Sequence, residues 1–134
     1  MSRLIVVSNR VSAPAEQGAS STGGLAMALA AVEEGLRRGS YMLRYATEDD
    51  FGLPETAFNV CTFWLIEALH LTGREADARA LFEEMLGRCT AAGLLSEDID
   101  PVSGELWGNY PQTYSLVGMI NCAVLLSKPW SSVR

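Results

Sequence analysis

The sequence predicts a mainly α-helical protein of about four helices, preceded by one short β-strand that has no sheet to join. Most of the chain consists of apolar-rich stretches of helical length, separated by glycine and proline. One continuous apolar run, residues 4–7, has the pattern of a buried strand, yet no alternation of apolar and polar residues elsewhere supplies partner strands. The length of 134 residues allows a single core of modest size.

The first segment contains this strand and one helix. Leu4–Val7 is apolar and mostly β-branched, and a stretch of small and polar residues follows it as a predicted loop. Gly23 and Gly24 then open an alanine-rich stretch, for which we predict a helix from Leu25 to about Arg38.

The character of the sequence changes after this helix, because aromatic residues and carboxylates replace the alanines. We therefore place a boundary between Ala31 and Ser40 and divide the chain into residues 1–37 and 38–134. The strand signal of the first part and the helical signals of the second do not agree on one fold class.

The second part predicts three helices and a long loop. Thr47–Pro54 has the turn and capping residues that precede a helix, and the helix predicted from Glu55 to Leu71 is apolar nearly all round, which is typical of an interior helix. An amphipathic helix follows from Arg74 to about Arg88. The connection Ala91–Gln112 is long enough to indicate a functional loop, and a last apolar helix spans Thr113–Leu126.

Composition excludes several classes of function. The formal net charge of −6 argues against a nucleic-acid-binding surface, which needs clustered Lys and Arg. No apolar stretch has the length of a membrane span, and the N-terminal apolar run is too short for a signal peptide, so we expect a cytoplasmic protein. Three separated cysteines and one histidine predict neither a disulfide framework nor a metal centre, and no motif indicates a cofactor.

Residues 38–134 resemble a known family. The motifs RYATEDDFGLPETAFNVCTFWLIEAL and LLSEDIDPVSGELWGNYPQTYS resemble the C-terminal part of bacterial glycoside hydrolase family 15, the glucoamylase and trehalase type. The resemblance implies a piece of an (α/α)6 barrel that hydrolyses α-glucosidic bonds with inversion, and it implies that Glu97 is the general base. Inversion requires a second carboxyl group as general acid. No stretch of the chain matches the segment that holds the acid in this family.

Other residues of the same loop are candidates for lesser roles. Trp107, Asn109 and Tyr110 lie in a stretch that resembles the family's loop beside the base, where they would either contact a sugar ring or brace the loop. The remaining carboxylates of this loop are expected to cap turns or face water, and the same capping role is expected for the aspartates that precede Phe51. The carboxylates meant here are Asp49, Asp50, Asp98, Asp100 and Glu105.

Residues 1–30 resemble a different family. The strand, the Ser-Asn-Arg sequence that ends in Arg10, and the glycine pair are similar to the N-terminus of trehalose-6-phosphate synthase, a family 20 glycosyltransferase. This resemblance implies that Arg10 contacts a sugar phosphate and that Gly23 and Gly24 let backbone N–H groups approach a nucleotide-sugar diphosphate. Because the rest of that family's fold is absent from this sequence, we expect Arg10 to be a solvated surface charge here.

Three functions follow as alternatives. The first is a hydrolase-type chain acting on trehalose or an α-glucan, which carries the general-base half of the site and is inactive alone. The second is a chimeric or truncated helical chain without turnover, which self-associates because its apolar helices exceed what their neighbours cover. The third is a glycosyltransferase fragment. A homo-oligomer is expected, and neither nucleic acid nor membrane is an expected partner.

Overall fold

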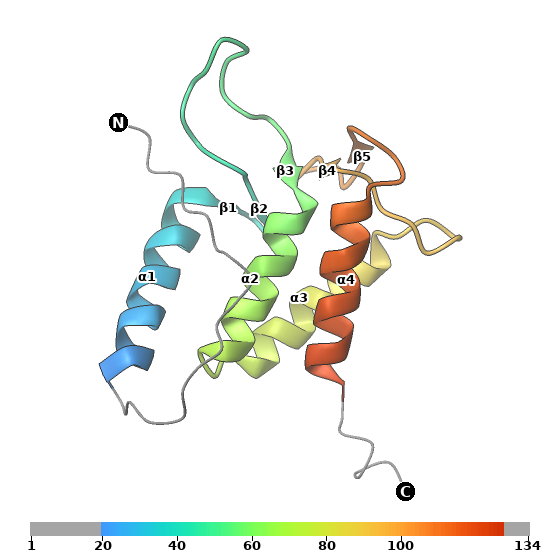
Figure 1. Cartoon of the computed structure of the whole chain (residues 1–134). Coiled ribbons are helices and arrows are strands. Elements are labelled where there is room, and N and C mark those ends of the chain that lie inside the picture. The colour runs from blue at the N-terminus through green and yellow to red at the C-terminus, as the bar shows by residue number, and fades with distance from the viewer. Residues whose placement is uncertain (1–19, 128–134) are drawn as a thin grey trace, which may run out of the picture.

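The computed structural model describes residues 20–127 and is mainly helical, as the sequence predicts (Figure 1). Four helices and five two-residue strands occur in this range. In chain order they are α1 (Ser20–Leu36), β1 (Arg37–Arg38), β2 (Tyr41–Met42), β3 (Ala57–Phe58), α2 (Asn59–Leu71), α3 (Glu75–Gly87), β4 (Asp98–Ile99), β5 (Leu106–Trp107) and α4 (Thr113–Leu126). The predicted strand Leu4–Val7 lies outside the described residues.

Helix α2 packs against both α3 and α4, and it lies between α1 and α4 in Figure 1. Its buried side chains include Phe63 and Ile66, which are fully removed from solvent, and the core continues onto Met85 of α3 and Cys122 of α4. Burial of each large apolar side chain contributes about 1.5–3 kcal/mol. The prediction of an interior helix is confirmed, and α3 and α4 also lie within one residue of their predicted ranges.

The predicted start of this central helix is wrong. It begins at Asn59 rather than Glu55, because Ala57 and Phe58 form β3 and pair with Ile99 and Asp98 of β4. Phe58, the residue before the helix, is extended and provides no side-chain cap. Pro54 therefore does not occupy the first helical turn.

The strands form two small antiparallel sheets. β1 and β2 form a hairpin, whose turn contains Gly39 at a positive φ of 60°. β3, β4 and β5 form the second sheet in that order, so this sheet joins the start of α2 to the long connection before α4. The connection was predicted as a loop, and the correction is that a short hairpin organises it.

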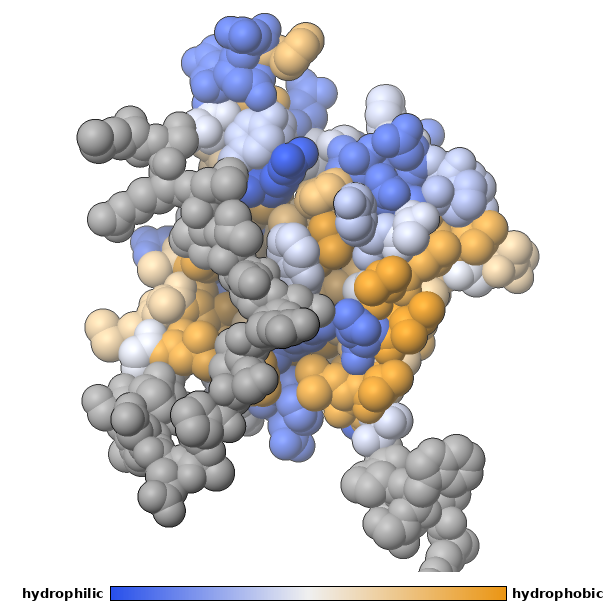
Figure 2. All heavy atoms as spheres, viewed as in Figure 1, coloured by the Kyte–Doolittle hydropathy of each residue, from blue (hydrophilic) through white to orange (hydrophobic). Residues whose placement is uncertain are grey.

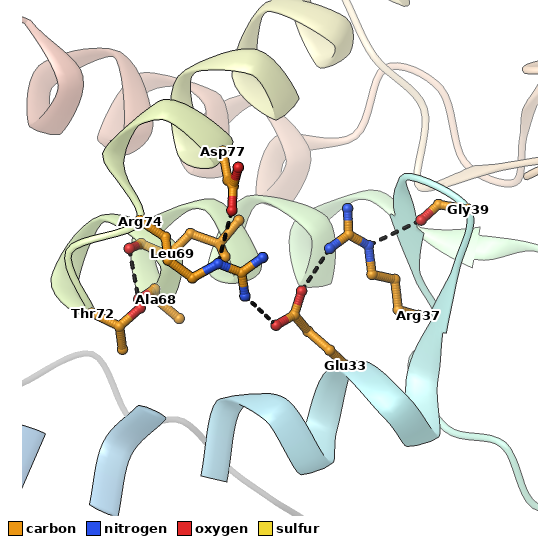
Figure 3. Close-up of polar contacts among 8 residues, drawn as sticks. All are labelled: Glu33, Arg37, Gly39, Ala68, Leu69, Thr72, Arg74 and Asp77. Carbon is orange, nitrogen blue, oxygen red and sulfur yellow. Dashed lines mark hydrogen bonds and ion pairs between the residues drawn. The ribbon is translucent and has the colours of Figure 1, made fainter. Parts of the chain in front are cut away.

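Helix α1 begins at Ser20 and ends at Leu36, earlier at both ends than predicted, since Arg37 and Arg38 belong to β1. Leu29 is buried, and Glu33 forms a polar clasp (Figure 3). The Glu33 carboxylate accepts hydrogen bonds from Nη1 of Arg37 and from Nη1 of Arg74, each at 2.6 Å. Arg74 precedes α3, so the clasp connects α1 to the rest of the described chain.

Hydrophobic side chains remain exposed on α4, where Figure 2 shows them gathered at one side of the molecule. Tyr114, Val117, Ile120 and Val124 have between 47% and 71% of their surface accessible. The spacing of three or four residues places these side chains on one face of the helix. Within residues 20–127, no helix is long and apolar enough to cross a membrane.

Candidate functional site

Glu97 lies at the start of the β4–β5 hairpin, and its backbone is fixed on both sides. Its N–H donates to the carbonyl of Asn109 at 2.8 Å, and its carbonyl accepts from the N–H of Asn59 at 3.0 Å. Two residues earlier, the carbonyl of Leu95 accepts from the N–H of Gln112 at 2.9 Å. The first turn of α2 and both arms of the long connection therefore hold the segment that carries Glu97.

A buried cluster of polar residues forms hydrogen bonds to the backbone of this segment. The Ser96 carbonyl accepts hydrogen bonds from Nδ2 of Asn59 at 2.9 Å and from Oγ of Ser115 at 2.7 Å, and all three residues are almost completely buried. The Ser96 hydroxyl donates to the carbonyl of Asp98. Among the described residues, Oδ1 of Asn59 has no hydrogen-bond partner. Buried polar groups are costly unless paired, so the cluster favours one arrangement of the chain.

The Glu97 side chain is half-buried and contacts Asn109 and Gly108. Its Oε2 accepts from Nδ2 of Asn109 at 2.9 Å and from the backbone N–H of the same residue at 3.2 Å. Gly108 has a φ of 77°, and a Cβ at this position would lie 3.1 Å from Cβ and Oε2 of Glu97. Glycine is therefore favoured here both by the backbone conformation and by the close approach of the carboxylate.

Trp107 lies on a different surface of the hairpin from the Glu97 carboxylate. It pairs with Asp98 across the sheet, and successive residues of a strand point to opposite faces. Trp107 is 51% exposed and lines a groove of about 370 Å³ that does not include Glu97. The other residues that line this groove are Phe51, Leu53, Glu55, Thr56 and Asp100.

Tyr110 follows Asn109 and is half exposed. Its hydroxyl lies 3.2 Å from the hydroxyl of Thr90, at the end of the segment after α3. The aromatic ring thus braces the long connection through its polar end and still presents surface to solvent.

Two of the neighbouring carboxylates cap turns, as predicted. Asp100 accepts hydrogen bonds from the backbone N–H groups of Ser103 and Val102, and these bonds lower its pKa. Asp49 accepts from the hydroxyl of Tyr45 and from the N–H of Phe51, with the same effect on its pKa.

Asp98 is different, because it is partly buried beneath the hairpin. Burial raises its pKa, and the hydrogen bond from the hydroxyl of Thr56 only partly offsets that effect. It is the carboxylate next to Glu97 in sequence, yet the strand pairing directs it toward the Trp107 side.

The first-segment candidates lie away from Glu97. Gly23 and Gly24 belong to the first turns of α1, where a Cβ at either would meet no other atom within 4 Å. This end of α1 lies far from the β4–β5 hairpin (Figure 1). Arg10 lies outside the described residues.

Sequence reasoning missed Asn59, Ser96, Ser115 and Gly108, which shape the surroundings of Glu97. A signal was present for two of them, since Asn59 and Ser115 are polar residues inside otherwise apolar helical stretches. Such a residue often marks a buried polar contact. Within the part of the chain that the structure describes, no group of three or more His, Cys, Asp or Glu residues could hold a metal ion.

Comparisons with known proteins agree with the hydrolase resemblance. The model of glycosyl hydrolases family 15 matches residues 25–124. The chain is 39% identical to the trehalase of Thermoplasma volcanium over 102 residues, which is 75% of this chain and 16% of that protein. It is 35% identical to the trehalase of Mycobacterium tuberculosis over 126 residues, which is 92% of this chain and 18% of that protein. The chain thus spans less than a fifth of these relatives, and no solved structure matches it.

Proposed function

We propose, for a chain that belongs to glycosyl hydrolases family 15, that Glu97 is the general base of a site that hydrolyses an α-glucosidic bond with inversion. The 134-residue chain then supplies the base half of this site and is inactive alone. The observation that carries the proposal is the Glu97 carboxylate, half-buried and hydrogen-bonded through one oxygen on a segment anchored at both ends.

The chemistry needs two carboxyl groups. Glu97 accepts a proton from water as the water oxygen bonds to the anomeric carbon, and the glycosidic bond breaks on the opposite face of the sugar. The second carboxyl group protonates the departing oxygen. In inverting enzymes these groups lie about 6.5–9.5 Å apart, which leaves room for the water. We assign no residue of this chain as the acid.

Trehalose is the proposed substrate, with other α-glucosides as the alternative, because the relatives are trehalases. Trp107 and Tyr110 offer exposed aromatic surface on which a pyranose ring can stack. A sugar ring on Trp107 would lie away from the bond that Glu97 hydrolyses, because the two side chains lie on different faces of the hairpin.

The test is complementation. The segment that matches this chain is deleted from the trehalase of Mycobacterium tuberculosis, and the 134-residue chain is added back as a separate polypeptide. Glucose release from trehalose is expected only from the mixture, and Glu97→Gln is expected to abolish it because the amide cannot accept the proton. Glu105→Gln, an exposed carboxylate of the same hairpin, is the control and should keep activity. Equal activity with Glu97→Gln and with the native chain would exclude Glu97 as the base.

A non-catalytic helical oligomer is the second candidate, favoured by the exposed apolar face of α4. We propose that the chain forms a dimer in which the exposed apolar face of α4 in one copy packs against the same face of the other copy. Light scattering of the purified chain should give at least a dimer, and Val117→Lys with Ile120→Lys should give a monomer. Val102→Lys, a substitution at an exposed position in the hairpin turn, should leave the dimer intact. A native chain that is monomeric at micromolar concentration would contradict this proposal.

The remaining predictions concern the first segment and the location of the protein in the cell. The similarity of residues 1–30 to trehalose-6-phosphate synthase, the boundary between residues 37 and 38, and a cytoplasmic location stay proposals. The family match begins at residue 25, before the proposed boundary. Saturable heat on titration with UDP-glucose, lost in Arg10→Ala, would support the transferase-like segment, and no heat would reject it.

A further inference from the structure

We propose that Asn109 is a positioning residue, which holds the Glu97 carboxylate by one oxygen and thereby aims the other oxygen at the catalytic water. This role rests on the proposed function of Glu97 as the base. It replaces a direct contact between Asn109 and the sugar.

Three hydrogen bonds join the two residues. Nδ2 and the backbone N–H of Asn109 both donate to Oε2 of Glu97, at 2.9 and 3.2 Å, and the carbonyl of Asn109 accepts from the N–H of Glu97 at 2.8 Å. Bonds to an ionised acceptor are stronger than neutral ones. Because both bonds to the Glu97 side chain end on Oε2, they restrict the rotation of the carboxylate.

The other oxygen, Oε1, receives no hydrogen bond from any residue between 20 and 127. A general base needs one oxygen within hydrogen-bonding reach of the water whose proton it takes. Oε2 is therefore held by the protein, and Oε1 remains available to accept a proton from the water.

Both partners sit on rigid backbone. The Ser96 carbonyl is fixed by the buried side chains of Asn59 and Ser115, and the carbonyl of Glu97 itself is fixed by the N–H of Asn59. Gly108 lets the backbone before Asn109 pass within contact distance of the Glu97 side chain. A carboxylate held between such supports keeps its position without help from a bound sugar.

Nuclear magnetic resonance of the labelled 134-residue chain tests the contact without requiring turnover. The Nδ2 protons of Asn109 should change their chemical shift in Glu97→Gln, which removes the negative charge from their acceptor and keeps the shape of the side chain. They should keep their chemical shift in the control Glu105→Gln. Unchanged Nδ2 resonances in Glu97→Gln would overturn the proposal.

The rotamer of Glu97 provides the second readout. Three-bond couplings should report one staggered χ1 state in the native chain and averaging in Asn109→Ala, while the amide resonances of the buried residues Asn59 and Ser96 keep their positions. A second variant, Asn109→Asp, keeps the size of the side chain and turns its donor into a negatively charged acceptor, so it should also release Glu97. Couplings that show averaging of the Glu97 χ1 angle in the native chain, or a single χ1 state in both variants, would refute the positioning role.

Kinetics separate this inference from the proposed function. In the complemented enzyme, Asn109→Ala should lower kcat by about 10–100-fold with KM nearly unchanged, because small displacements of a reacting group are costly. A raised KM with normal kcat would instead make Asn109 a sugar contact and reject positioning. If activity in the complementation assay does not depend on Glu97, the proposed function of Glu97 as the base is rejected, and the contact with Asn109 has no catalytic role. The resonance data test whether the contact itself exists, independently of that result.

Discussion

Replacing Gly118 by alanine probes the packing of α4 against α2. A Cβ at position 118 would lie 2.9 Å from Cβ of Phe63 and 3.0 and 3.1 Å from two of its ring carbons. Phe63 is fully buried, and its Cβ is fixed to the backbone of α2. The added methyl group therefore cannot be accommodated by rotating a flexible side chain, so one helix has to move.

The magnitude follows from two opposing effects. Alanine in a helix interior is favoured over glycine by about 1 kcal/mol. Overpacking of a well-filled core costs about 1–3 kcal/mol. Gly87→Ala is the matched control, since Gly87 ends α3 and a Cβ there meets no atom within 4 Å. The two substitutions should therefore differ by about 1–3 kcal/mol in the free energy of unfolding, with Gly118→Ala the less stable.

Urea unfolding followed by far-UV circular dichroism measures this difference. Each 1 kcal/mol corresponds to about 4 °C in Tm for a domain of this size, so thermal unfolding provides an independent check. Equal stability of the two alanine variants would refute the reasoning, because it would mean that α2 and α4 do not pack as closely as the Phe63 contact requires.

Three further predictions rest on other contacts. Glu33→Gln should speed amide hydrogen exchange in α1, by up to about tenfold for each 1.4 kcal/mol lost, while Glu34→Gln, a change at an exposed neighbour, should not. Burial raises the pKa of the Cys61 thiol to about 11, so about one in a thousand is ionised at pH 8, and alkylation should be about a hundredfold slower than in the urea-unfolded chain. The lowered pKa of Asp100 means that its stabilising effect is present above its unfolded pKa and is lost as pH falls through the folded value; Asp100→Asn should flatten the acid branch of the stability curve.

The helices were predictable because each carries its own signal. The apolar stretches that became α2 and α4 are long enough to specify helix without reference to the rest of the chain, and the glycine after α2 marks its end. Their ends are less local. Ala57 and Phe58 look like the start of α2, and only their pairing with β4, far along the chain, makes them a strand.

The long connection illustrates the same limit. A strand of two residues is too short to show alternation, so the hairpin that carries Glu97 has no periodic signature. The resemblance to a family predicted that Glu97 and its neighbouring stretch share one loop, and the structure brings Asn109 beside Glu97. The resemblance could not predict on which face of the hairpin Trp107 lies. That face depends on the pairing register of β4 and β5, which neither strand specifies alone.

The polar cluster around Glu97 uses three elements of this chain: the first turn of α2, the hairpin, and the first turn of α4. Each supplies a buried donor or a fixed backbone group, so contacts within this chain hold the Glu97 carboxylate in place. The exposed face of α4, by contrast, has no cover among the described residues. In the proposed complementation, the partner chain is therefore expected to supply the second carboxyl group and an apolar surface, whereas residues 94–112 come from this chain. If complementation succeeds, the resonances of Ser96 and Asn109 should therefore change far less than those of Val117 and Ile120.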